Sequence, residues 1–270
     1  MTSKSKDHSR RDDVGDRAAR PNHMHGYCRV IGCKHPARAG TDDGLDERYC
    51  RSHAEHYQRH GSPTKASYTA KELNPYRQAA LSWILENEDK HWVQDAIRRV
   101  SSLYSKAGRH EEAFRLRGLP PKERARIAIA RLRKHGVDPR IVLAACVAVE
   151  MILRDDPQSD TRSEFRDVQV AKVVHRMASG THKRWERELP AADPWSRPKI
   201  HVQELHAFPR SRGRVLRHIG ASAMSTAELL IEHHLDEIHA YKQLRDEQGR
   251  FDDRPYPKGW RARPRSTEGY

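Results

Sequence analysis

The sequence predicts a mainly α-helical protein with a small cysteine-rich module near its amino end. Three of its four cysteines fall between residues 28 and 50, and apolar residues recur at helical spacing through most of the remainder. The first and last stretches are charged and lack apolar periodicity. We therefore expect disordered tails at residues 1–26 and 250–270, a module at 27–65 and an all-helical domain at 66–249.

Composition indicates a soluble protein with an anionic partner. The chain has 270 residues, with 51 Lys and Arg against 37 Asp and Glu, which gives a net charge of +14. The pI is near 9.8 and the mean hydropathy is −0.96. Nucleic acid is the commonest partner of so basic a chain. Neither a signal peptide nor a membrane-spanning apolar run is visible, so a cytoplasmic location, in a bacterial or phage-infected cell and with nucleoid association as an option, is expected.

Two pairs of metal-ligand residues lie in the cysteine-rich segment. Cys28 and Cys33 form the first pair, and Gly32 allows the chain to turn back just before the second thiolate. Cys50 and His53 form the second pair, at a spacing that places both on one side of a helix's first turn. Cytosolic cysteines rarely form disulfides, so these cysteines are expected to be thiols or metal ligands. Since Zn²⁺ prefers four thiolate and imidazole ligands, the sequence predicts a structural zinc site.

The chain around these pairs predicts a treble-clef-like arrangement of knuckle, hairpin and helix. The stretch "GTDDGLDERY" between the pairs is typical of a turn or short hairpin. Three further histidines, His35, His56 and His60, are close enough to replace His53 as the fourth ligand. The segment has few apolar groups, so its metal affinity would supply its folding free energy. Cys146 stands in an apolar run and is expected to be a core thiol.

Residues 27–63 resemble a known small module. The spacing Cys28-x4-Cys33, the motif "YCRSH" and the motif "YQRHGSP" are similar to a zinc-binding module of phage and mobile-element proteins, often found beside HNH-type endonucleases. In that family the helix carries an aromatic residue and an arginine and ends in a Gly-Ser-Pro turn. Here Tyr57 is the aromatic residue, Arg59 is the arginine, and Gly61, Ser62 and Pro63 form the turn. The resemblance implies association with DNA. The His, Asn and His of an HNH nuclease are not found downstream.

Five helices are predicted between the module and residue 180. The first opens at Asn74 and Pro75, the second runs from His91 to Gly108, and a basic helix ends at Gly136. "PRIVLAACVAVEMILRDD", which is apolar nearly all round, predicts the buried central helix, and "SEFRDVQVAKVVHRMASG" predicts the next. Prolines favour a linker near residues 186–200.

A last long helix is predicted from a capping box at Ser225 and Glu228 to Gly249. Four polar residues on it have metal-ligand side chains, but we expect them to be helix surface because no partner helix is found for a carboxylate-bridged site. These are Glu232, His233, Asp236 and His239.

Basic residues supply the candidate phosphate contacts. They come from the module helix, from the basic helix and from a turn around Gly213; a solvated face or a plain loop is the alternative in each case. The candidates are Arg59, Lys122, Arg124, Arg126, Arg131, Arg133, Lys134, Arg210, Arg212, Arg214 and Arg217.

The function that the sequence predicts is a zinc-containing, DNA-associated protein of phage or mobile-element type, with non-specific phosphate binding through basic helices and tails. Two alternatives remain open. One is a metal-dependent, HNH-like nuclease, and the other is a scaffold that binds a protein partner. Nucleotide-binding loops, nucleophile elbows and dinucleotide fingerprints are not found in the sequence.

Overall fold

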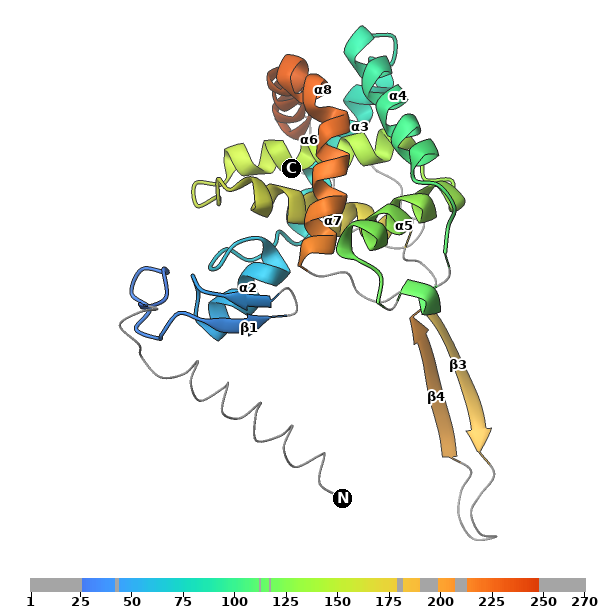
Figure 1. Cartoon of the computed structure of the whole chain (residues 1–270). Helices are drawn as coiled ribbons and strands as arrows, with labels where there is room; N and C mark the ends of the chain where they lie inside the picture. The colour runs from blue at the N-terminus through green and yellow to red at the C-terminus, as the bar shows by residue number, and fades with distance from the viewer. Residues whose placement is uncertain are drawn as a thin grey trace, which may run out of the picture.

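The computed structural model confirms a mainly α-helical protein (Figure 1). Within the part it describes there are seven α-helices, one short 3-10 helix and two small antiparallel sheets. None of the described helices has the length and apolar character that a membrane span requires. Most of both predicted tails lies outside the described residues, which are 26–41, 44–111, 113–116, 118–178, 182–189, 199–206 and 213–247.

The amino-terminal module contains a knuckle, a hairpin and a helix in that order. A bridge between Tyr27 and Pro36 closes the knuckle, and the strands β1 (Ala39–Thr41) and β2 (Gly44–Asp46) pair antiparallel. Helix α2 (Arg51–His60) follows. This is the treble-clef-like order that the sequence predicts. The module has its own small core, separate from that of the helical domain and formed by Cys28, Ala39, Tyr49, Cys50, Ala54 and Tyr57.

The helical domain is built around α6. As predicted, this helix is apolar nearly all round. Ten of its residues between Val142 and Ile152 are buried, and Cys146 is one of them, with no exposed surface. It packs against α3, α4, α7 and α8, so it forms the centre of the domain. The elements of the domain are α3 (Ala70–Glu86), α4 (His91–Lys106), η1 (Ala113–Leu116), α5 (Pro121–Lys134), α6 (Pro139–Asp155), α7 (Ser163–Met177) and α8 (Arg214–Glu247).

Two predicted helix starts are wrong. Helix α3 begins at Ala70, where Thr69 and Glu72 form a capping box, and Pro75 lies inside the helix. Helix α8 begins at Arg214, eleven positions before Ser225. The Ser225 hydroxyl donates to the Ser222 carbonyl oxygen, a bond that a mid-helix serine makes without ending the helix. In both cases the helix begins before the pair of residues that the sequence predicts as its start, because the preceding residues also pack in the fold.

A long hairpin interrupts the helices between α7 and α8. Strands β3 (His182–Leu189) and β4 (Lys199–His206) pair antiparallel over their whole length, from His182 opposite His206 to Leu189 opposite Lys199. Residues 186–189 and 199–200, predicted to belong to a linker, are therefore strand, and the rest of that linker lies outside the described residues. In Figure 1 the hairpin extends from the helical body as an arm.

Candidate metal centre

Four side chains of the module form a compact cluster with metal-ligand chemistry. The ligand atoms of Cys28, Cys33, Cys50 and His53 all lie within 4.8 Å of one another. The His53 Nδ1 atom is 3.4 Å from the Cys28 Sγ atom and 3.3 Å from the Cys50 Sγ atom, and the Sγ atoms of Cys33 and Cys50 are 3.9 Å apart. A tetrahedral ion with metal–sulfur bonds of about 2.3 Å would separate its sulfurs by about 3.8 Å. The cluster can therefore bind a metal ion.

The knuckle positions the first pair. The Cys28 amide donates to the His35 carbonyl at 2.9 Å and the Cys33 amide donates to the Val30 carbonyl at 3.0 Å, so the chain reverses between the two thiols. Gly32 has a φ of 80°, in the left-handed region that glycine adopts without steric cost. The local sequence thus fixes both sulfurs on one side of a single turn.

Helix α2 positions the second pair. Cys50 is its N-cap residue, with extended backbone angles, and the Ala54 amide donates to the Cys50 carbonyl at 2.8 Å. His53 comes one turn later on the same side. The three cysteines are free thiols, since the Sγ separation of 3.9 Å between Cys33 and Cys50 far exceeds a disulfide bond of about 2.05 Å.

The two buried thiols differ in acidity. Burial works against the Cys28 thiolate, yet backbone amides of Cys50 and Val30 outweigh it and hold the Cys28 pKa below its usual value. Burial raises the pKa of Cys50, and the neighbouring thiols add to that rise. Backbone donors directed at a sulfur favour its thiolate form, which is the form that binds a metal.

The other three histidines near the cluster, His35, His56 and His60, do not belong to it. His56 Nδ1 lies 2.8 Å from the Ser62 carbonyl oxygen, and its ring stacks on His60 at 4.3 Å between centroids. His60 Nδ1 accepts from the Ser67 amide at 2.9 Å. His35 is exposed. None of the three joins the group of close ligand atoms, so His53 is the imidazole of the cluster.

Polar contacts dock the module on α7. Arg162 donates to the Tyr49 hydroxyl at 3.0 Å, and Gln169 donates its amide to the His60 carbonyl at 3.1 Å. The Lys172 ammonium lies 3.3 Å from the His60 Nδ1 atom of the module and 2.5 Å from the Ser67 hydroxyl oxygen just beyond it. Burial is the main cause that lowers the pKa of Lys172 to about 8. The module therefore has a fixed position on the helical domain.

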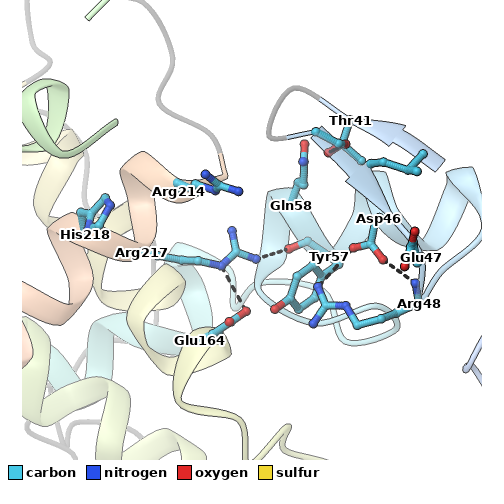
Figure 2. Close-up of a pocket in the computed structure, with 12 residues that line it drawn as sticks. Thr41, Asp46, Glu47, Arg48, Tyr57, Gln58, Glu164, Arg214, Arg217 and His218 are labelled. Carbon is cyan, nitrogen blue, oxygen red and sulfur yellow. Dashed lines mark hydrogen bonds and ion pairs between the residues drawn. The ribbon is translucent and has the colours of Figure 1, made fainter. Parts of the chain in front are cut away.

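The start of α8 docks on the other side of the module helix. The Arg217 guanidinium donates to the Glu164 carboxylate at 3.1 Å and to the Tyr57 carbonyl at 3.3 Å, and it lies 4.6 Å from the centroid of the Tyr57 ring. Figure 2 shows Arg217 between Glu164 and Tyr57. Arg48 lies 5.0 Å from the centroid of the same ring. Tyr57 is thus in contact with two cations.

These contacts border an open cleft of about 580 Å³ between the module and α8. Its charged lining is balanced, with three arginines and three carboxylates: Arg48, Arg214, Arg217, Asp46, Glu47 and Glu164. Figure 2 shows Arg214 at the cleft, on the side of α8. Arg48 is not among the residues that the sequence predicts for a site, because residues that meet only after folding leave no local spacing signal.

Helix α5 does not present all its predicted phosphate contacts. Arg131 is 2 % exposed and its guanidinium lies 3.1 Å from the His175 Nε2 atom, so its assignment as a nucleic-acid contact is wrong. Burial lowers the pKa of Arg131 to about 10. The buried side of α5 is broad, since it contains Ile127 and Ala128 as well as Ala125, Ile129 and Leu132.

Two more α5 arginines bind the end of α4. Arg126 donates to the carbonyl oxygens of Ala107 and Arg109, and Arg133 donates to those of Tyr104 and Gly108. A helix leaves its last four carbonyls without intrahelical partners, and guanidinium groups there also complement the helix dipole. These two side chains therefore have a structural role.

The remaining predicted contacts divide into three groups. Lys122 and Lys134 are exposed on α5, Arg124 is half-buried there, and Arg59 is exposed on α2, where it pairs with Glu55. Arg214 and Arg217 lie in the first turn of α8, which replaces the predicted flexible turn. Arg210 and Arg212 lie outside the described residues.

The polar residues of α8 act at its surface, as expected. His239 lies 2.7 Å from the Asp155 carboxylate, Asp236 pairs with Arg154, and His233 stacks on Trp92 at 4.4 Å. Glu232 is exposed. Among the described residues, the Cys₃His cluster is the one group of three or more ligand residues whose ligand atoms lie this close together.

Comparison of the chain with protein-family models, with curated proteins and with solved structures found no match. The properties of the module therefore rest on its own residues: a Cys₃His cluster held by a knuckle and by the first turn of a helix beside a small hairpin.

Proposed function

We propose that this protein is a zinc-containing, DNA-associated protein whose zinc is structural and whose basic residues bind phosphates without sequence preference. The observation that carries the proposal is the Cys₃His cluster in its knuckle, hairpin and helix. Three thiolates and one imidazole match the ligand preference of Zn²⁺, and four protein ligands leave no open position for catalysis. The small core of the module explains why a metal would be needed there.

The charge of the chain supports an anionic partner. Its net charge is +14, and Lys122 and Lys134 are exposed on α5. Similarity of residues 27–63 to modules of phage and mobile-element proteins favours DNA over other polyanions. Phosphate binding of this type weakens with salt, because each contact releases condensed counterions.

One experiment tests the metal and the function together. Bound metal is measured by mass spectrometry in the wild-type protein and in a Cys50→Ser variant, and both are titrated with a 30-base-pair DNA duplex in a mobility-shift assay. The proposal expects one zinc per wild-type chain, loss of zinc in the variant, and DNA affinity that falls linearly with salt on a double-logarithmic plot. Absence of a shift even at low salt would refute DNA association.

The nuclease and scaffold alternatives have separate tests. Incubation of plasmid DNA with the protein and Mg²⁺ or Mn²⁺ detects cleavage, and dependence on histidines outside the module would favour a nuclease. A partner chain that copurifies after nuclease treatment would favour the scaffold.

A further inference from the structure

The knuckle, residues 27–36, ends in a tight turn. The Cys33 amide donates to the Val30 carbonyl at 3.0 Å, and Gly32 has a φ of 80°, so Ile31 and Gly32 are the two corner residues of a four-residue turn. The cysteines on the two sides of this turn both belong to the metal cluster. The tip of the knuckle is therefore held in place from both sides.

The side chain at the tip is an uncovered aliphatic group. Ile31 is fully exposed, whereas its neighbour Val30 packs against the small core of the module. Tyr27, at the base of the same knuckle, is 64 % exposed. Among the described residues five large apolar side chains are exposed, and two of them belong to this knuckle. Single exposed apolar residues are common, but two within one short loop form a patch that can bind a partner.

The knuckle is also positively charged. Arg29, two positions before Ile31, and Lys34, three positions after it, are both exposed, and residues 26–41 contain no Asp or Glu. Three thiolates would exceed the charge of a bound Zn²⁺ by one, and Arg29, Lys34 and Arg38 outweigh that excess. In Figure 1 the knuckle lies at the outer end of the module, away from the helical body. An apolar tip flanked by cations complements a DNA duplex, in which stacked bases lie between rows of phosphates.

We propose that the knuckle is a wedge: Ile31 inserts between neighbouring base pairs from the minor groove of a DNA duplex, and Arg29 and Lys34 contact the adjacent phosphates. This inference rests on the proposed function and adds the surface that binds and the change that it makes in the DNA. Minor-groove proteins insert aliphatic side chains such as isoleucine in this way, and the opened base step bends the duplex toward the major groove. An aliphatic group has no π-face on which an unpaired base could stack, so the tip fits a base step better than a single strand.

DNA bending distinguishes insertion from simple phosphate binding. A 30-base-pair duplex carries a donor fluorophore at one end and an acceptor at the other, and energy transfer is measured as the full-length protein is added to saturation. The wild-type protein is expected to shorten the end-to-end distance. Ile31→Ala is expected to bind several-fold more weakly and to leave the saturated duplex straight, whereas Ile31→Leu, which keeps an apolar tip, should retain the bend.

Leu85→Ala is the matched control, because Leu85 is an exposed aliphatic residue on α3, outside the module. It is expected to bind and bend DNA as the wild type does, and zinc content and helicity show that each variant keeps its fold. A straight wild-type complex, a bend retained in Ile31→Ala, or an equal loss in Leu85→Ala would overturn the wedge and leave the proposed function standing. A wild-type protein without DNA affinity would refute both.

A mismatched duplex tests the insertion step itself. A mismatch at the centre of the duplex makes the bases there easier to unstack. The wild-type protein should therefore bind the mismatched duplex several-fold more tightly than the matched one, and Ile31→Ala should bind the two equally. A preference for the mismatch that survives in Ile31→Ala would overturn the insertion of Ile31, and so would tighter binding of the wild type to the separated single strands.

The salt dependence of binding tests the two cations. Arg29→Gln and Lys34→Gln should each lower the salt slope by about 0.9, the value for one phosphate contact. Arg98→Gln removes the same charge from an exposed position on α4 and should leave the slope unchanged. An unchanged slope in both knuckle variants, or an equal change in Arg98→Gln, would overturn the assignment of phosphate contacts to the knuckle.

Discussion

Gly61 lies directly against the backbone of Glu164: a Cβ atom at position 61 would be 2.4 Å from the Glu164 carbonyl oxygen. The φ of Gly61 is 78°, which ends α2 in the left-handed region. The same residue therefore ends the module helix and allows the module to approach α7. No residue with a Cβ atom fits both requirements.

Gly61→Ala should destabilise the protein by about 2–4 kcal/mol, since left-handed alanine alone costs about 1–2 kcal/mol and the overlap with Glu164 adds to it. Urea unfolding measures the change. Gly136→Ala is the control, because Gly136 has a φ of 61° with open space around it and should lose only the backbone part. Equal effects at both positions would contradict the close approach.

Helices α7 and α8 should separate in Gly220→Ala. A Cβ atom there would lie 1.9 Å from the Asp167 carbonyl oxygen. Inside a helix, alanine is normally more stable than glycine by about 1 kcal/mol. We expect Gly220→Ala to lower the free energy of unfolding by several kcal/mol instead, because of the steric overlap. Thermal unfolding compares it with Ser222→Ala on the same helix, which is expected to be neutral. A stabilised Gly220→Ala would rule out the contact.

Removal of the metal by a chelator should unfold the module and spare the helical domain. The two hydrophobic clusters are separate, and the module's cluster is too small to hold without a metal. Limited proteolysis should then cut within residues 27–60, while circular dichroism retains most of the helix signal. Cys146→Ala should keep its metal, because that thiol is buried in the domain core. Loss of metal from this variant would count against the four assigned ligands.

Stability should fall between pH 6.5 and pH 4. Burial, with the charges of Arg131 and Arg176, lowers the pKa of His175 to about 4, so below its unfolded value the unfolded chain binds a proton that the folded chain does not. Between pH 7 and pH 5 this one group should cost about 2 kcal/mol of unfolding free energy. His60, with its pKa lowered to about 4 mainly by burial, acts in the same direction.

Urea unfolding at both pH values, in the wild type and in His175→Gln, isolates the His175 contribution. Between pH 7 and pH 5, the free energy of unfolding of the variant should fall by about 2 kcal/mol less than that of the wild type. His135→Gln, at an exposed position, should keep the full loss. An unchanged pH dependence in His175→Gln would show that His175 is not the responsible group.

The metal cluster could be predicted from sequence because its geometry is local. Cys28 and Cys33 lie on one turn, and Cys50 and His53 lie on one helical turn, so their spacing specifies each pair. The spacing also predicted His53 as the fourth ligand but left its replacement by His56 or His60 open. Only the fold excludes those two, since they are held by Ser62 and Ser67 through contacts formed on folding.

The sequence by itself determined the helices and the module, because helical periodicity and ligand spacing are short-range properties of the chain. Tertiary structure decided the roles of the arginines on α5: Arg131 is buried against His175, and Arg126 and Arg133 bind carbonyl oxygens at the end of α4. It also decided the hairpin, since the pairing of β3 with β4 depends on contacts across an intervening segment rich in proline. Side-chain direction and strand pairing are set by the whole fold, and local sequence carries little information about either.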